Sequence, residues 1–315
     1  MARQILFIDS LEKLSVKKDS SLLMAHTYKE LGIEVYLLFE KDFYVTNKDG
    51  PKFRVYDFDS SLEKSSFYLA DFKLSSHHEI NLKEGDVFHM RIDPPFDTRY
   101  LRYLWMLRHI KTFGVKVTND PDGVLLHNEK MTAYKDESAL ESYIGMSSES
   151  SYSFLKTLKE EGIKDIILKP LDLYQGIDVI KMSLDDLEKV NKHFDEKTRS
   201  WEGPGIIQPF NEAVKSGEIR ALFYKNKEIG SIIKVPLKGE YLANIARGAS
   251  FEKTQLNERQ FQSCEKVATE LSQYGIDFIA FDILGDSLNE VNITCPGLLV
   301  EVSEAHSKNL AKLLL

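Results

Sequence analysis

The chain has 315 residues, of which 43% are hydrophobic and 29% are charged, and it carries a formal net charge of -8. This composition is typical of a globular protein with two or three substructures, and the acidic balance argues against a nucleic-acid or membrane-surface partner. Because there are only two cysteines and no apolar run of bilayer length, we expect a cytoplasmic protein that does not span a membrane.

The first part of the chain predicts a parallel α/β sheet. Residues 4–8 are a short apolar run that favours a strand and not a secretion leader. A helix capped by Ser20 or Ser21 is expected to end at Gly32, and residues 33–39 form the next strand. The order strand, helix, strand is typical of the opening of a parallel sheet.

Further strands and a long helix complete this first unit. A buried strand over residues 86–90 ends at two prolines, and Asp97 or Thr98 then caps a helix that Gly114 ends. The remaining expected strands are residues 53–58, 67–74 and 115–117. We place an N-terminal α/β substrate domain at residues 1–118.

Two more units follow, so the sequence predicts an α/β fold with a central domain at residues 119–200 and a C-terminal domain at residues 201–315. In the central domain we expect helices over residues 150–161 and 184–194, and strands over 165–169 and 177–182. In the C-terminal domain we expect strands over 205–208, 218–224 and 228–235, a helix over 257–274, a hairpin within 278–296 and a helix from Ser303.

The hairpin within residues 278–296 is the most informative segment. Two apolar strands meet there at a tight turn, with Asp282 on the first strand and Glu290 and Asn292 on the second. Side chains two residues apart on a strand point to the same face, and a hairpin can bring Asp282 beside them. Two carboxylates and an amide oxygen form a hard site suited to Mg²⁺ carrying nucleotide phosphates. The alternative, a sheet edge that happens to carry polar residues, is disfavoured by the strongly apolar flanking positions.

Two lysines are candidates for binding phosphate. Lys169 ends an apolar strand, and Pro170 forces the chain to leave the sheet directly after it, so the ammonium group is expected to face a cleft. Lys130 lies in a polar segment and, taken alone, is typical of a solvated surface lysine. With the metal site, the two ammonium groups could bracket one triphosphate.

Other signals are weaker when taken singly. Arg220 and Arg247 follow strands and could stabilise the charge of a transferring phosphoryl group, although surface arginines are common. The turn after Lys169 has one glycine, Gly176, where a loop covering phosphate usually has several. The sequence has no P-loop, no dinucleotide-binding fingerprint and no convincing Ser, Cys or His nucleophile set.

Taken together, these residues resemble those of the bacterial glutathione synthetases, which are ATP-grasp carboxylate–amine ligases. The similarity covers nearly the full length of the chain. It is carried by Lys17–Ser21, Arg91–Asp97, Asn128–Lys130, Ile167–Asp172, and Asp282–Asp286 followed by Glu290–Thr294. Five such segments in the family's order are not expected by chance.

The resemblance implies an ATP-grasp fold, with an N-terminal parallel α/β domain, a small α+β lid as the central domain, and a C-terminal α+β domain that holds the metal. ATP would bind between the last two domains. The nucleotide residues would be Lys130, Lys169, Gly176, Gln208, Phe210 and Glu218, with Arg220 and Arg247 near the phosphates. Asp282, Glu290 and Asn292 would hold Mg²⁺, with Mn²⁺ as an alternative.

The resemblance also implies the reaction. A substrate carboxylate attacks the γ-phosphoryl group of ATP, and an amine then displaces phosphate from the acyl phosphate to form an amide. Lys18, Ser20 and Arg91 are the candidates for binding the γ-glutamyl peptide or related acid. Phosphoryl transfer needs positioning and charge neutralisation more than a protein nucleophile, which agrees with the residues present. Homo-oligomers are common among family members, so one is expected here by analogy.

The chain departs from the family pattern at three places. The lid turn reads Asp172-Leu-Tyr-Gln-Gly176, where the family has a glycine-rich turn. Leu242 and Val300 stand about where the family has arginines that we expect near the carboxylate of the incoming amino acid. A buried carboxylate without its cation is disfavoured by several kcal/mol in order of magnitude, so these losses suggest a different second substrate.

Three functions therefore remain in competition. The first is a glutathione synthetase that joins γ-glutamylcysteine and glycine with ATP. The second is an ATP-grasp ligase of the same build with another amine or peptide. The third is a nucleotide-binding module without catalytic activity, which the presence of the whole Asp282, Glu290 and Asn292 set disfavours.

Overall fold

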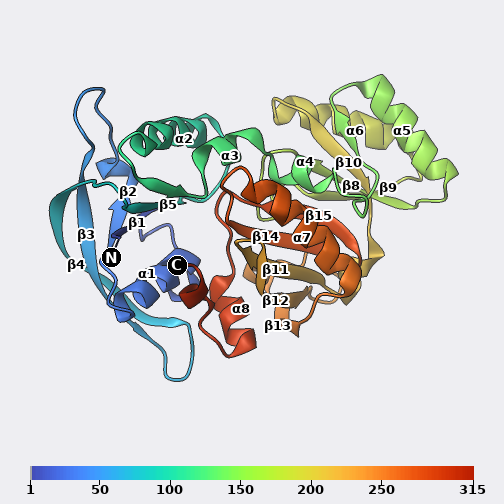
Figure 1. The fold of residues 1–315 in the computed structure, drawn as a ribbon. Helices are drawn as coiled ribbons and strands as arrows, with labels where there is room; N and C mark the ends of the chain where they lie inside the picture. The colour runs from blue at the N-terminus through green and yellow to red at the C-terminus, as the bar shows by residue number, and fades with distance from the viewer. Residues whose placement is uncertain (1) are drawn as a thin grey trace.

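The computed structural model describes residues 2–315, in which three β-sheets are covered by helices (Figure 1). The first sheet has the strand order β4-β3-β2-β1-β5-β6. Its parallel part and the helices that connect it are β1 (Gln4–Ile8), α1 (Ser20–Glu30), β2 (Val35–Phe39), β5 (Val87–Arg91), α2 (Thr98–Lys111) and β6 (Lys116–Thr118). The predicted parallel sheet is confirmed, and β1 is buried at every position, as its unbroken apolar run requires.

Helix α1 is capped by Asp19 and not by either of the predicted serines. The side chain of Asp19 accepts a hydrogen bond from the backbone N–H of Leu22, so the prediction of Ser20 or Ser21 as the cap is wrong. Both serine hydroxyls have other partners: Ser20 accepts from the Leu299 N–H, and Ser21 accepts from Arg91.

A long antiparallel hairpin extends the first sheet at one edge. It consists of β3 (Lys52–Leu62) and β4 (Leu69–Asn81), and both strands are longer than predicted. Most positions of β4 are exposed, and the predicted strand over residues 67–74 missed the second half of β4 because the polar side chains there form no apolar run.

The second sheet is small and has the strand order β7-β10-β8-β9. Its elements are β7 (Tyr143–Gly145), α5 (Ser148–Glu160), β8 (Asp165–Pro170), β9 (Ile180–Ser183), α6 (Leu187–Ser200) and β10 (Gly205–Pro209). Helix α6 begins three residues after its predicted start because Asp186 caps it, and β9 also begins three residues after its predicted start. Because β10 pairs with β7 and β8, strand pairing favours a boundary after residue 209 and not at residue 200.

The third sheet is antiparallel, with the order β13-β12-β11-β14-β15. Its elements are β11 (Glu218–Tyr224), β12 (Lys227–Val235), β13 (Ser250–Thr254), α7 (Glu258–Ser272), β14 (Phe278–Leu284) and β15 (Ser287–Asn292), followed by α8 (Leu299–His306). The prediction that the last helix begins at Ser303 is wrong by four residues, because its first turn is buried throughout and, apart from Glu301, apolar, so it lacks the polar face of a surface helix. The short helices α3 (Pro121–Leu126) and α4 (Glu129–Ala133) connect the first two sheets and were not predicted.

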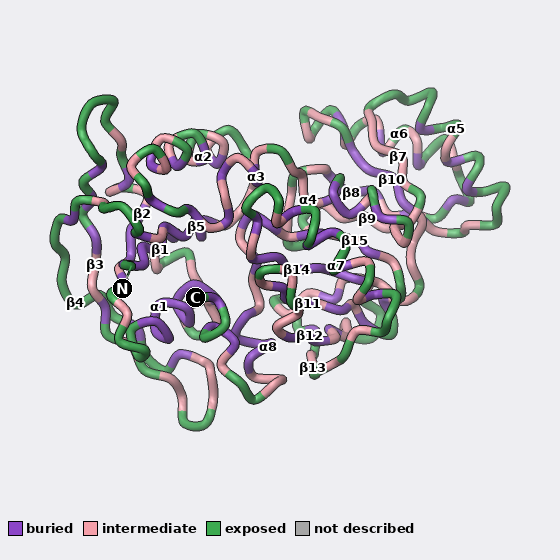
Figure 2. Tube along the Cα trace, viewed as in Figure 1, coloured by how far each residue is buried: buried purple, intermediate pink, exposed green. Residues whose placement is uncertain are grey.

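One hydrophobic core joins the first and third sheets. Leu23 of α1, Leu222 of β11, Leu299 of α8 and Leu314 near the C-terminus belong to the same buried cluster. Figure 2 shows α1 and much of α8 as buried in this region. No helix within residues 2–315 is both long and apolar enough to cross a membrane.

Candidate active site

A cavity of about 540 Å³ opens where the three sheets approach one another. Its walls come from the loop before α1, the end of β5, the second sheet (β7-β10-β8-β9, called the lid sheet below) and the third sheet. Every residue predicted for the site lines this cavity except Arg247, which is exposed on a short turn over residues 245–247. The predicted residues are far apart in sequence, so their convergence supports a single site.

The three predicted metal ligands lie together on the hairpin of β14 and β15. Asp282 and Glu290 are directly opposite each other in the strand register. The amide nitrogen of Asn292 donates to Asp282 Oδ2 at 3.0 Å and to the backbone oxygen of Ala280, also at 3.0 Å. These bonds orient the amide, so its oxygen is available beside two carboxylates.

Two cations, one on β11 and one on β12, neutralise Asp282. Lys234 Nζ lies 3.0 Å from Asp282 Oδ1 and 2.7 Å from Glu218 Oε2, and Arg220 Nη2 lies 2.9 Å from Asp282 Oδ2. Burial alone would raise the pKa of Asp282, but Arg220 and Lys234 hold that pKa below its usual value. Burial opposes the charge on Lys234, yet Asp282 and Glu218 raise its pKa. The four side chains thus form a buried network with alternating charges.

The two predicted phosphate lysines face the same region. Lys130 Nζ lies 3.0 Å from Glu290 Oε1 and donates to the backbone oxygen of Leu173 at 2.6 Å, so Lys130 is a buried residue of α4 and not a surface lysine. Lys169 Nζ lies 3.3 Å from Asn289 Oδ1. Burial lowers the pKa of Lys169 to about 8, while the nearby Glu290 opposes this shift. A bound anion would raise this pKa again, because it favours the charged ammonium form.

Two loops meet over the mouth of the cavity. Tyr241 OH donates to the backbone oxygen of Val179 at 3.0 Å, and Asn244 Nδ2 donates to that of Gln175, also at 3.0 Å. Gly176 has a φ of +72° and a Cβ built there would lie 3.2 Å from Leu242 Cδ1. The departures at the lid turn and at Leu242 are therefore in contact with each other.

Gln208 and Phe210 line the lid side of the cavity. Gln208 is buried, and Lys181 Nζ lies 3.7 Å from the centre of the Phe210 ring. The Phe210 ring therefore forms an aromatic wall of the cavity, and the ammonium group of Lys181 holds it in place.

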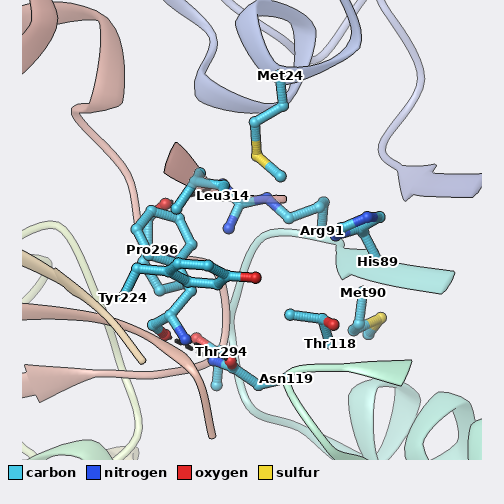
Figure 3. A pocket seen from close by; sticks show the side chains of 11 residues that line it. Met24, His89, Met90, Arg91, Thr118, Asn119, Tyr224, Thr294, Pro296 and Leu314 are labelled. Atoms are coloured by element: carbon cyan, nitrogen blue, oxygen red, sulfur yellow. Dashed lines mark hydrogen bonds between the residues drawn. The ribbon is translucent and has the colours of Figure 1, made fainter. Parts of the chain in front are cut away.

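The far end of the cavity carries the residues predicted for the acid substrate. Lys18 is half-buried and has no ion pair or side-chain hydrogen bond within residues 2–315. Arg91 Nε donates to Ser21 Oγ at 3.0 Å and Nη2 donates to the backbone oxygen of Pro296 at 2.9 Å. Figure 3 shows this guanidinium reaching from β5 toward Pro296, at a second cavity of about 10 Å³. Two of the five N–H donors of Arg91 are therefore used within the protein.

The donor set fits a hard divalent cation. Within residues 2–315 no group of three or more His, Cys, Asp or Glu side chains is arranged for a metal, but Asp282 and Glu290 with the oxygen of Asn292 are a different kind of set. Carboxylate and amide oxygens are preferred by Mg²⁺ and Mn²⁺, and phosphate oxygens complete their coordination.

Two residues of the site were not predicted. Lys234 interrupts the apolar run Ile232-Ile-Lys234-Val, and Glu301 interrupts Leu298-Leu-Val-Glu301-Val. A charge within an apolar run was the signal that identified Lys169, and it was available at both positions. By contrast Val300 is buried in the core and does not line the cavity, so its side chain has no direct bearing on the substrate.

The arrangement of the three sheets is the ATP-grasp fold. Among solved structures, D-cycloserine synthetase DcsG has a TM-score of 0.66 at 12% identity, with 99% of this chain and 98% of that chain covered. The ATP-grasp ligase PsnB, solved with a minimal precursor, has a TM-score of 0.60 at 15% identity, with 98% and 96% covered. Identities this low show the fold alone.

Sequence relatives define the family. The family model of the prokaryotic glutathione synthetase N-terminal domain matches residues 3–124, and that of the ATP-grasp domain matches residues 130–307. The glutathione synthetase of Wigglesworthia glossinidia brevipalpis is 28% identical over 312 residues, which cover 98% of this chain and 95% of the relative. This chain belongs to the prokaryotic glutathione synthetase family.

Family membership confirms the predicted fold class and type of reaction. The chain is an ATP-dependent carboxylate–amine ligase of the glutathione synthetase type, which acts on small molecules and uses a divalent metal ion. It is an enzyme, so the hypothesis of a nucleotide-binding module without activity is set aside.

Proposed function

We propose that the chain joins γ-glutamylcysteine to glycine at the expense of ATP, through a γ-glutamylcysteinyl phosphate, with Mg²⁺ as the metal ion. The observation that carries this proposal is the single cavity that has phosphate-binding cations and carboxylates at one end and Lys18 with Arg91 at the other. Because one cavity contains both sets of residues, the carboxylate of the acid substrate can be held beside the γ-phosphoryl group of ATP.

The roles of the residues follow from their charges. Lys130, Lys169 and Arg220 would bind the ATP phosphates, and Lys130 is presently held by Glu290. Asp282, Glu290 and Asn292 would hold Mg²⁺, which when bound supplies positive charge at the phosphate oxygens. Gln208, Phe210 and Glu218 would bind the nucleoside, with Gly176 in the turn above it.

At the other end, Lys18 would bind a carboxylate of the acid substrate. Ser20 and Arg91 would shape this pocket, since the hydroxyl of Ser20 and two of the five N–H donors of Arg91 already have partners within the protein, and the other donors of Arg91 remain for the substrate. We keep Arg247 as a candidate only for a state in which the loop that carries it moves toward the cavity.

A ligase of the same build with a different amine substrate is the second candidate. It is favoured by Leu242, which lines the cavity in the loop where the family has an arginine. A leucine there supplies no charge for the carboxylate of glycine, and it suits an amine with an apolar side chain. The cytoplasm is our proposed compartment, because both cysteines are free.

An ADP-release assay tests both candidates. The purified protein would be given ATP, Mg²⁺ and γ-glutamylcysteine, with each amino acid in turn as the amine, and without acid substrate as a control. Turnover with glycine alone supports the proposed reaction, whereas turnover only with another amine supports the second candidate. The absence of turnover with any of the amines would contradict γ-glutamylcysteine as the acid substrate.

A further inference from the structure

Glu301 is a buried residue that lines the active-site cavity, and one of its carboxylate oxygens lacks a partner. Its side chain projects from the first turn of α8, the residue is 1% exposed, and its Oε2 accepts no hydrogen bond anywhere in residues 2–315. A buried carboxylate oxygen without a donor is costly, so such a group calls for a ligand with N–H or O–H donors.

The surroundings of Glu301 indicate where such a ligand would sit. Lys18 and Asp19, from the loop before α1, and Arg220, from β11, are the charged groups that act on its carboxyl group, and the phenol of Tyr68 is also near. Arg220 is also bonded to Asp282. Glu301 therefore lies between the phosphate end of the cavity and the end that holds Lys18.

A structural role alone accounts poorly for this position. A glutamate in the first turn of a helix interacts favourably with the helix dipole, but that effect does not require burial against a cavity. The cations in the same cavity suit carboxylates and phosphates, whereas Glu301 suits a positively charged donor. An ammonium group is the positively charged donor that the proposed reaction brings to this point.

We propose that Glu301 binds the ammonium group of the incoming amine substrate and accepts the proton that this group must lose before its nitrogen can attack. This inference rests on the proposed function. Burial raises the pKa of Glu301, which favours uptake of a proton by its carboxylate.

In the proposed step the amine nitrogen loses two protons, one C–N bond forms and one C–O bond breaks. One proton moves from the ammonium nitrogen to Glu301, and the freed electron pair forms the new C–N bond to the acyl carbon. The bond between that carbon and the phosphate oxygen breaks, and phosphate leaves with the electron pair. The nitrogen loses its second proton to the departing phosphate as the amide forms.

The test compares two nucleophiles in the full-length enzyme. With γ-glutamylcysteine and ATP, hydroxylamine traps the acyl phosphate as a hydroxamate, and it needs no base because it is already neutral near neutral pH. Glu301→Gln should lower the rate of amide formation with the amine substrate by about 100-fold, while hydroxamate formation stays within about threefold. Glu265→Gln, on the exposed face of α7, makes the same change far from the cavity and should alter neither rate.

Several results would overturn the assignment of Glu301. These are an equal loss in both assays, no loss in either, or a raised KM for the acid substrate with hydroxylamine, which would place its α-ammonium group at Glu301 instead. Should Glu301→Gln fold poorly in a thermal melt, Glu301→Asp keeps a carboxylate but shortens the side chain by one methylene, so amide formation should fall more than hydroxamate formation; a proportional fall in both rates would contradict the proposal. A wild-type enzyme that forms no hydroxamate would contradict the proposed function itself, and this inference with it.

Discussion

The two ends of the active-site cavity differ in how their charges are balanced. At the phosphate end, Asp282 is bonded to Lys234 and Arg220, and Glu290 is bonded to Lys130. At the substrate end, Lys18 and one oxygen of Glu301 have no partner within residues 2–315. The carboxylates at the phosphate end are thus neutralised by cations of the protein, whereas the buried oxygen of Glu301 at the substrate end is left for a ligand to satisfy.

The largest expected effect comes from the metal-binding carboxylates. Asp282→Asn keeps the shape of the side chain but removes the charge that a divalent cation needs, so ATP turnover should fall by at least about 100-fold. Asp286→Asn, in the exposed turn of the same hairpin, is the matched control and should stay near wild type. Steady-state ADP release measures both, and unchanged turnover of Asp282→Asn would remove this residue from the metal site.

Removal of a cation from the phosphate end should cost stability. Lys234→Met leaves Glu218 and Asp282 buried without their shared ammonium group, so the free energy of unfolding should fall by about 3 kcal/mol. Lys238→Met, at an exposed position in the following loop, should change it by less than about 0.5 kcal/mol. Urea unfolding measures the difference, and equal stability of the two variants would show that the network is not coupled.

Removal of a cation from the substrate end should instead cost binding. Lys18→Met breaks no ion pair, so stability should change by less than about 0.5 kcal/mol, while KM for the acid substrate should rise by about tenfold. KM for ATP should stay unchanged. An equal rise of both KM values would contradict the assignment of Lys18 to the acid substrate.

The smallest expected effect is a pH dependence of ATP binding. Because burial lowers the pKa of Lys169 to about 8, the free protein loses this charge as the pH rises through that value. Bound phosphates favour the charged form, so ATP affinity should fall by about five- to tenfold between pH 7 and pH 9, with proton uptake on binding. Calorimetry in two buffers measures both effects. Lys169→Arg stays charged throughout, so its affinity should be flat, and a parallel fall would assign the effect to another group.

Much of the fold and the site could be predicted because both depend on local patterns. The parallel strands are unbroken apolar runs, and the proposed metal ligands lie two residues apart on one strand and opposite each other across a hairpin. Prediction failed where burial follows from tertiary pairing. Lys130 reads as a surface lysine until α4 packs against β15, and β10 joins the lid sheet only because it pairs with β8.

The unpredicted charges show the same limit in a different form. Lys234 and Glu301 each lie in an apolar run, which indicates burial but does not reveal the partner. Whether such a charge is neutralised by the protein or awaits a ligand depends on residues distant in sequence. Val300 illustrates the converse, because it stands about where the family has an arginine, yet its side chain is buried in the core and does not line the cavity.

A crystal structure with Mg²⁺ and a non-hydrolysable ATP analogue tests the central claim most directly. We predict a metal ion about 2.0–2.1 Å from oxygens of Asp282, Glu290 and Asn292, with the triphosphate between this ion and Lys130 and Lys169. Density for the metal or the triphosphate elsewhere, with Asp282 still bonded to Lys234 and Arg220 and Glu290 still bonded to Lys130, would contradict it.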